Sequence, residues 1–186
     1  DVGLSSYAPF AYYLSNTKNS ALKSRIILKH SLFFPSTEHL AFNKSNRLLK
    51  GIIDKAMRLV SDDQVSKLKS MWPVALEQKD DNSGTHWSVL EKQYFAENQV
   101  IKMCVDPDWM PLESIQQGKH VGVAADVIRL IQQQLGVPIQ LVETRNWEET
   151  LSFAKSRRCD ILSMAMDTPE RRAYLSFTDP YLVTPL

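Results

Sequence analysis

Long apolar runs, a strong net charge and clustered metal ligands are all absent from this sequence of 186 residues. No apolar run approaches the roughly 20 residues that a membrane-spanning helix requires, so membrane contact is expected only through segments outside the chain. The net charge is +1, which gives no basic field for phosphate binding and argues against nucleic acid as a partner. The four histidines lack the spacing of metal ligands, so neither a metal site nor another cofactor is predicted.

Cysteine is also scarce, with only Cys104 and Cys159, each in a predicted strand. In an oxidising compartment the two could form a disulfide. Because free cysteine is among the most buried residue types, two buried and unpaired thiols are the expected state.

What the chain does have is enough apolar material, 44% of its residues, to bury one or two cores. In the second half, strands and helices alternate, which implies a parallel sheet with right-handed crossovers. Asp126–Leu135 is predicted to be a helix that Gly136 ends. Asn146, with Glu149 three residues later, resembles a capping box at the start of a second helix. The predicted strands are Val100–Val105, Ile139–Val142 and Cys159–Leu162.

The first half contains one strongly amphipathic helix, Arg47–Val60. Ser61 begins a capping box, which predicts a second helix that Pro73 ends. The polar stretch 77–85 has no apolar periodicity and is the best candidate linker, and Trp87–Ala96 is predicted to be a short helical hinge. Two further strands are predicted, at Ile26–Leu28 and His39–Phe42.

The stretch from Ser163 to Tyr181 carries the most chemical information. Thr168, followed by Pro and Glu, is typical of a helix start. Arg171 then falls in the first turn of that helix, at the carboxyl end of a predicted strand, where open α/β sheets bind ligands. Its planar guanidinium can donate two parallel hydrogen bonds to a carboxylate. The alternative is a solvated arginine in a surface turn.

Five motifs in the second half resemble, in chain order, the N-terminal lobe of family 3 of the type II periplasmic solute-binding proteins. Each motif alone is weak, but together and in order they are specific. The resemblance implies an α/β Venus-flytrap fold, present as partial modules with a parallel or mixed sheet flanked by helices. The motifs are Val100–Glu113 with its aromatic-x-Pro loop, Gly118 with Gly122–Asp126, the pair Asn146 and Trp147, Cys159–Leu162, and Thr168–Arg171 continuing to Tyr181.

The first half resembles the other end of the same fold, over Asp1–Tyr13 and Leu40–Trp72, and Leu90–Ile101 resembles the connector between tandem modules. We therefore expect a fragment of a longer protein. Its apolar helices in 47–72 need cover, either from the second-half lobe as a permuted lobe or from a second copy in a homodimer. An intact ligand cleft is not expected, because the second module's other lobe is missing. The predicted divisions are the end of a first module at 1–73, a linker and connector at 74–98, and the first lobe of a second module at 99–186.

The resemblance also assigns the ligand contacts. The family's arginine after Thr-Pro-Glu grips the carboxylate of the ligand and corresponds to Arg171. The family's aromatic platform corresponds to Trp109, and Asp106 would line the same cleft. Met166 stands where amino-acid binders usually carry a hydroxyl, and Thr168 completes the predicted set of contacts.

Two departures from the family pattern suit either a sensor with a ligand other than an ordinary amino acid or a module that signals without a ligand. Met166 cannot donate a hydrogen bond to a carboxylate. The second-lobe acid that pairs with a ligand ammonium falls, by spacing, at Ser6. The predicted partner is a small molecule, with anionic or amino-acid-like chemistry. Trp72 and Trp147 are expected in the core.

The function that the resemblance implies is ligand sensing in the periplasm, by the extracytoplasmic part of an inner-membrane protein. Ligand would close a two-lobed clamp and signal to a cytoplasmic kinase or diguanylate cyclase domain. The alternative is the substrate-binding protein of an amino-acid importer. An enzyme ranks last, and no catalytic residue is assigned, because no nucleophile–base pair or separated carboxylate pair stands out.

Overall fold

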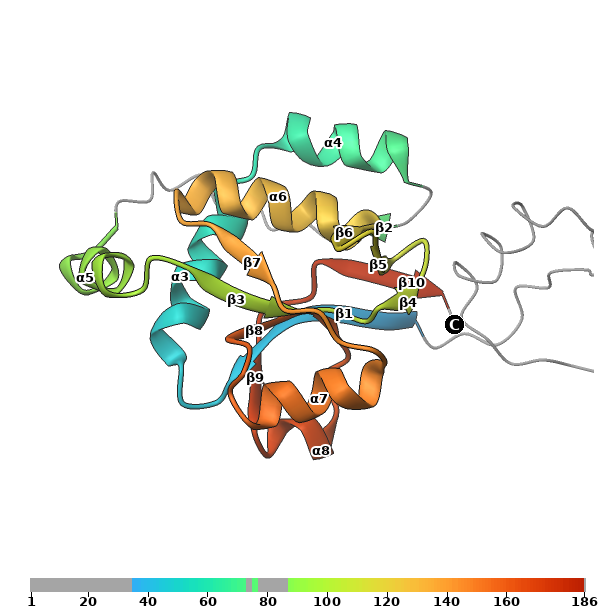
Figure 1. Ribbon diagram of the computed structural model, residues 1–186. Helices are drawn as coiled ribbons and strands as arrows, with labels where there is room; N and C mark the ends of the chain where they lie inside the picture. The colour runs from blue at the N-terminus through green and yellow to red at the C-terminus, as the bar shows by residue number, and fades with distance from the viewer. Residues whose placement is uncertain (1–34, 73–74, 77–86, 186) are drawn as a thin grey trace, which may run out of the picture.

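The computed structural model describes residues 35–72, 75–76 and 87–185. The segment Asp1–Tyr13, Ser6 within it, the predicted strand Ile26–Leu28 and the linker at 77–85 lie outside the described residues. Most described residues belong to one α/β body built on a mixed sheet (Figure 1). No helix in the described ranges is long and apolar enough to span a bilayer.

The mixed sheet has the strand order β2-β10-β1-β8-β3-β7, with β9 also paired to β1. β3 is parallel to both β7 and β8, which confirms the parallel sheet predicted for the second half. A separate three-stranded sheet has the order β4-β5-β6. The strands of the mixed sheet are β1 (Pro35–Asn43), β2 (Ala75–Leu76), β3 (Ile101–Cys104), β7 (Ile139–Leu141), β8 (Ile161–Ala165), β9 (Leu175–Phe177) and β10 (Leu182–Pro185), and those of the small sheet are β4 (Asp108–Trp109), β5 (Glu113–Gln116) and β6 (Lys119–Val121).

Helices cover both faces of the mixed sheet. Figure 1 shows α3, α4 and α6 on one face and α7 and α8 on the other. Successive residues of β1 serve the two faces, as the period of a strand requires: Leu40 and Phe42 enter the larger core, and Ala41 enters the smaller one. The helices are α3 (Arg47–Arg58), α4 (Asp62–Met71), α5 (Val89–Glu97), α6 (Val123–Leu135), α7 (Trp147–Lys155) and α8 (Pro169–Arg172).

The first half of the chain supplies a central strand to this sheet. β1 runs antiparallel to β8, β9 and β10. Helix α3 begins at the cap Asn46 and packs against α6, and it buries Leu49, Ile52, Ile53 and Ala56 while Leu48 stays exposed. Two alternatives were left open for what packs on these helices, the second-half lobe or a second copy of the chain. In the described residues, the second-half lobe of the same chain packs on them. The assignment of 1–73 and 99–186 to different modules stays a prediction.

Helix α6 begins three residues before its predicted start at Asp126. Gly122 precedes its first turn with φ of 108°, and a Cβ there would lie 2.6 Å from Leu112 O. Only glycine fits this conformation and this close approach. The prediction missed this start because no capping side chain marks it.

The expectation of two free thiols was wrong. Cys104 and Cys159 form a disulfide, with their Cα atoms 5.8 Å apart. Cys104 ends β3, and Cys159 lies just before β8, the strand that pairs in parallel with β3. Both side chains are buried, as expected, but burial alone does not separate a thiol from a disulfide. A signal that could have helped was the placing of one cysteine in each of two strands predicted for the same parallel sheet.

Candidate functional site

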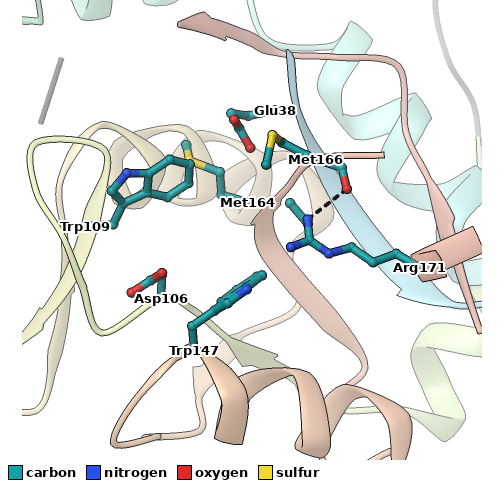
Figure 2. A pocket seen from close by; sticks show the side chains of 8 residues that line it. Glu38, Asp106, Trp109, Trp147, Met164, Met166 and Arg171 are labelled. Carbon is teal, nitrogen blue, oxygen red and sulfur yellow. Dashed lines mark hydrogen bonds between the residues drawn. The ribbon is translucent and has the colours of Figure 1, made fainter. Parts of the chain in front are cut away.

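A cleft of about 180 Å³ lies at the carboxyl ends of β3 and β8 (Figure 2). Four of the five predicted ligand contacts line it, contributed by three different segments. This is the edge at which open α/β sheets bind ligands. The lining residues are Glu38, Asp106, Trp109, Trp147, Met164, Ala165, Met166 and Arg171.

Arg171 reaches the cleft from α8. Its Nη1 donates a hydrogen bond of 3.0 Å to the backbone O of Met166. Its guanidinium carbon lies 5.2 Å from the ring centroid of Trp147, in a cation–π contact. In the described part of the chain this is the only hydrogen bond that its side chain donates, so further N–H groups of the guanidinium are available to a ligand.

Thr168 holds the start of α8 and is absent from the lining of the cleft. Its Oγ1 accepts a hydrogen bond from Arg171 N and donates one of 3.1 Å to Glu170 Oε2. The neighbouring Pro169 occupies the first helical position, where its missing N–H costs nothing. The structure therefore places Thr168 as the cap that orients Arg171.

Trp109 and Trp147 form the aromatic walls of the cleft (Figure 2). Trp109 ends the short strand β4, where it was predicted as a platform. Trp147 was expected in the core, and the structure shows it only partly buried and lining the cleft. It is the first residue of α7, after the cap Asn146, so its ring lies at the rim of the sheet instead of beneath the helix.

Asp106 follows the end of β3 and lines the cleft. Burial raises the pKa of its carboxyl, and the charges of Asp108 and Glu148 add to that rise. The hydrogen bond that its Oδ1 accepts from Asp108 N opposes the rise. Asp106 is thus an acceptor that is held in place by its own loop.

A buried carboxylate, Glu113, ties the loop of Asp106 to strand β8. Its Oε1 accepts a hydrogen bond of 2.8 Å from Asp106 N, and its Oε2 accepts one from Ser163 Oγ. His120 Nε2 lies 3.3 Å from Oε2, close enough for an ion pair but not aligned for a hydrogen bond. Burial raises the pKa of Glu113, while these partners act against the rise. Glu113 therefore holds the loop of Asp106 against strand β8, behind the cleft.

Sequence reasoning missed Glu38, which reaches the cleft from β1. The side chain is 0% exposed. Ser36 Oγ donates a hydrogen bond of 2.7 Å to Glu38 Oε1, whereas Oε2 has no partner among the described residues. Burial raises the pKa of Glu38, the charge of Glu113 adds to the rise, and Ser36 and Arg171 oppose it. No local signal marks this residue, because only the pairing of β1 with β8 brings it to the site.

Glu38→Gln should raise the free energy of unfolding at about pH 7. The folded pKa of Glu38 lies above the ordinary value of 4.5, so the folded protein binds this proton more tightly than the unfolded chain does. Stability therefore falls as the pH rises through the window above 4.5, and glutamine removes that loss.

Urea unfolding at a series of pH values measures this effect. The advantage of the variant should shrink as the pH falls toward 4.5 and vanish well below that value, where glutamate is protonated in both states. Glu97→Gln, on the exposed side of α5, is the matched control and should show no such trend. A loss of stability in Glu38→Gln that is the same at every pH would contradict the account.

No group of three or more His, Cys, Asp or Glu side chains that could hold a metal ion occurs in the described ranges. The site instead combines one guanidinium, two carboxyl groups and two indole rings. Such a set suits a small polar organic molecule, bound by hydrogen bonds and stacking.

Residues 101–186 match the family model of bacterial extracellular solute-binding proteins, family 3. The virulence sensor protein BvgS of Bordetella pertussis is 20% identical over 146 residues, which are 78% of this chain and 12% of that protein. A probable histidine-binding protein of Campylobacter jejuni is 33% identical over 86 residues, which are 46% of this chain and 33% of that protein. The chain thus spans a third or less of the length of these curated relatives.

Among solved structures, the periplasmic domain of B. pertussis BvgS aligns with a TM-score of 0.45 and 21% identity, over 47% of this chain and 17% of that chain. An arginine-bound domain 1 of the protein named TmArgBP aligns with a TM-score of 0.42 and 20% identity, over 50% of this chain and 82% of that chain.

Proposed function

Because residues 101–186 match the family model of bacterial extracellular solute-binding proteins, family 3, we propose that the chain is the ligand-sensing region of a bacterial transmembrane signalling protein, lying in the periplasm. In this proposal it catalyses no reaction. In this proposal the described residues form one of the two lobes of a clamp. Ligand binding would close the two lobes and pass a hinge motion to a cytoplasmic kinase or cyclase domain. The membrane anchor and the output domain would lie outside the chain.

The observation that carries the binding role is Arg171 in its cleft. The guanidinium stands at the strand ends with donors to spare, beside two indole rings. A carboxylate or another small anion would accept paired hydrogen bonds from it. Trp109 and Trp147 would cover the apolar part of the same ligand.

Sensing is favoured over transport by how far the similarity to each relative extends. The similarity to BvgS covers 146 residues, more than the second-half lobe alone holds, whereas the similarity to the histidine-binding protein covers 86. The second candidate is nevertheless a binding protein that delivers its ligand to an importer.

The test uses a protein that contains both complete modules and its output domain. Amino acids and small carboxylates are screened by thermal shift, and the activity of the output domain is then measured with and without each ligand that stabilises the protein. A sensor predicts that ligand changes the output activity. Bound ligand without any change in output, combined with loss of uptake in a deletion strain, would support the importer and contradict sensing.

A further inference from the structure

The carboxyl group of Glu113 and the imidazole of His120 face each other in the interior, behind the cleft. The side chain of Glu113 is 0% exposed and that of His120 is 8% exposed, and His120 Nε2 lies 3.3 Å from Glu113 Oε2. Within the described ranges, Nε2 has no hydrogen-bond partner. Buried polar atoms of folded proteins nearly always have one, so a buried nitrogen this close to a carboxyl group points to a role beyond packing.

The two groups titrate as a pair, because each changes the cost of charging the other. Burial raises the pKa of Glu113, and His120 acts against that rise. Histidine is the side chain that ordinarily changes charge between about pH 5 and 8. Without a proton the pair is a buried negative charge that has no counter-ion, and with two protons its carboxyl group is no longer a charged acceptor. The pair is therefore most stable when it holds one proton.

Glu113 connects this proton to two walls of the cleft. Its Oε1 accepts a hydrogen bond of 2.8 Å from Asp106 N, and in the pairing of β4 with β5 it lies opposite Trp109. Its Oε2 accepts a hydrogen bond from Ser163 Oγ on β8. Figure 2 shows Asp106 and Trp109 on the side of the cleft away from Arg171. A change at Glu113 would therefore move one side of the cleft relative to the other.

We infer that Glu113 and His120 act as one positioning unit, in which a shared proton holds Asp106 and Trp109 in place and the loss of that proton at higher pH releases them. Neither side chain of the unit lines the cleft, so both act through the residues that do. The inference goes beyond the proposed function, because it needs neither a ligand nor a second lobe.

Other titratable groups surround the pair, and two of them could also make the cleft respond to pH. Burial raises the pKa of both Glu38 and Asp106, and both line the cleft. Burial also raises the pKa of Tyr181, which stays neutral throughout the range in which histidine titrates. The groups are Glu38 on β1, Asp106 and Asp108 at β4, Lys119 on β6, Asp126 on α6, Glu143 beside the turn between β5 and β6, and Tyr181 before β10.

The experiment is an NMR titration of the unliganded chain from about pH 5 to 9, which brackets the range of histidine. Three signals are followed: the imidazole of His120, the backbone N–H of Asp106 and the indole N–H of Trp109. In the wild type all three should change with one common midpoint, because one proton controls them. No ligand is present, so the outcome is separate from that of the proposed function.

Three variants identify the source of the transition. Glu113→Gln should abolish it at Asp106 and Trp109 while His120 still titrates, because an amide cannot share the proton. His120→Gln should move the midpoint at Trp109 by about one pH unit or more, because the carboxyl group then titrates alone. His39→Gln is the matched control and should keep the transition, since this second buried histidine lies 2.8 Å from Thr178 O through its Nδ1.

The wild type alone can contradict the inference, even where a variant fails to fold. Signals of Asp106 and Trp109 that stay constant over the whole range, or that change with a midpoint different from that of His120, would overturn it. A transition at Trp109 that persists unchanged in Glu113→Gln would also overturn it, because Glu38 or Asp106 would then be its source.

Discussion

Replacing Cys104 and Cys159 together by alanine should lower the free energy of unfolding by about 4 kcal/mol. The disulfide closes a loop over a sequence separation of 55 residues, and the chain-entropy model gives about that cost for a loop of this size. The loop holds α6, β7 and α7, so the link ties the end of β3 to the start of β8 across the whole β-α-β-α-β unit.

Urea unfolding of the oxidised wild type and of the double variant measures the difference. Reduction of the wild type with dithiothreitol should bring its unfolding midpoint close to that of the variant, and the variant itself should not respond to the reductant. Two free thiols found by mass spectrometry in the oxidised wild type would contradict the pairing. So would equal unfolding midpoints in the wild type and the variant.

The disulfide also bears on the proposed location. Disulfides form and persist in oxidising compartments, among them the bacterial periplasm. The pairing of Cys104 with Cys159 is therefore in line with an extracytoplasmic region.

Arg171→Ala should weaken the binding of a carboxylate ligand about 100-fold or more, in a protein that holds both complete modules. Two charge-assisted hydrogen bonds from one guanidinium contribute enough to account for a loss of that size. The chain supplies a matched control one position later. Arg172 is exposed and binds Asp167 with Nε and Nη2, so Arg172→Ala should leave ligand affinity unchanged.

Isothermal titration of wild type, Arg171→Ala and Arg172→Ala with the best ligand from the screen checks this prediction. Arg171→Lys should also bind weakly, because a lysine keeps the charge but cannot form the paired bonds of the planar fork. Equal losses in the Arg171 and Arg172 variants would mean that α8 contributes only general positive charge.

The second-half lobe could be predicted well because its signals are local. Asn146 caps α7 by accepting a hydrogen bond from Glu149 N, as its spacing indicated. The alternation of strands with helices predicted a parallel sheet, and the pairing of β3 with β7 and β8 confirms it. Ser61 likewise caps α4 with the capping box that the sequence predicted. These features depend on residues three or four apart, or on a repeated pattern of elements.

The missed features depend on pairs that are far apart in the chain. Glu38 reaches the cleft only because β1 pairs with β8, and no pattern near Glu38 indicates that contact. Predicting the disulfide required the distance between two strand ends, which residue type and burial do not give. Trp147 was expected in the core, but its position at the first turn of α7 puts it on the cleft.

The most direct test of the carboxylate-binding cleft is an NMR titration that follows all four tryptophan indoles at once. With a small carboxylate, the signals of Trp109 and Trp147 should shift with one common dissociation constant. Trp72, whose Nε1 donates to Asp126, and Trp87, which packs on Phe95, should stay in place. Shifts confined to Trp72 or Trp87, or shifts of Trp109 and Trp147 that persist unchanged in Arg171→Ala, would contradict the account.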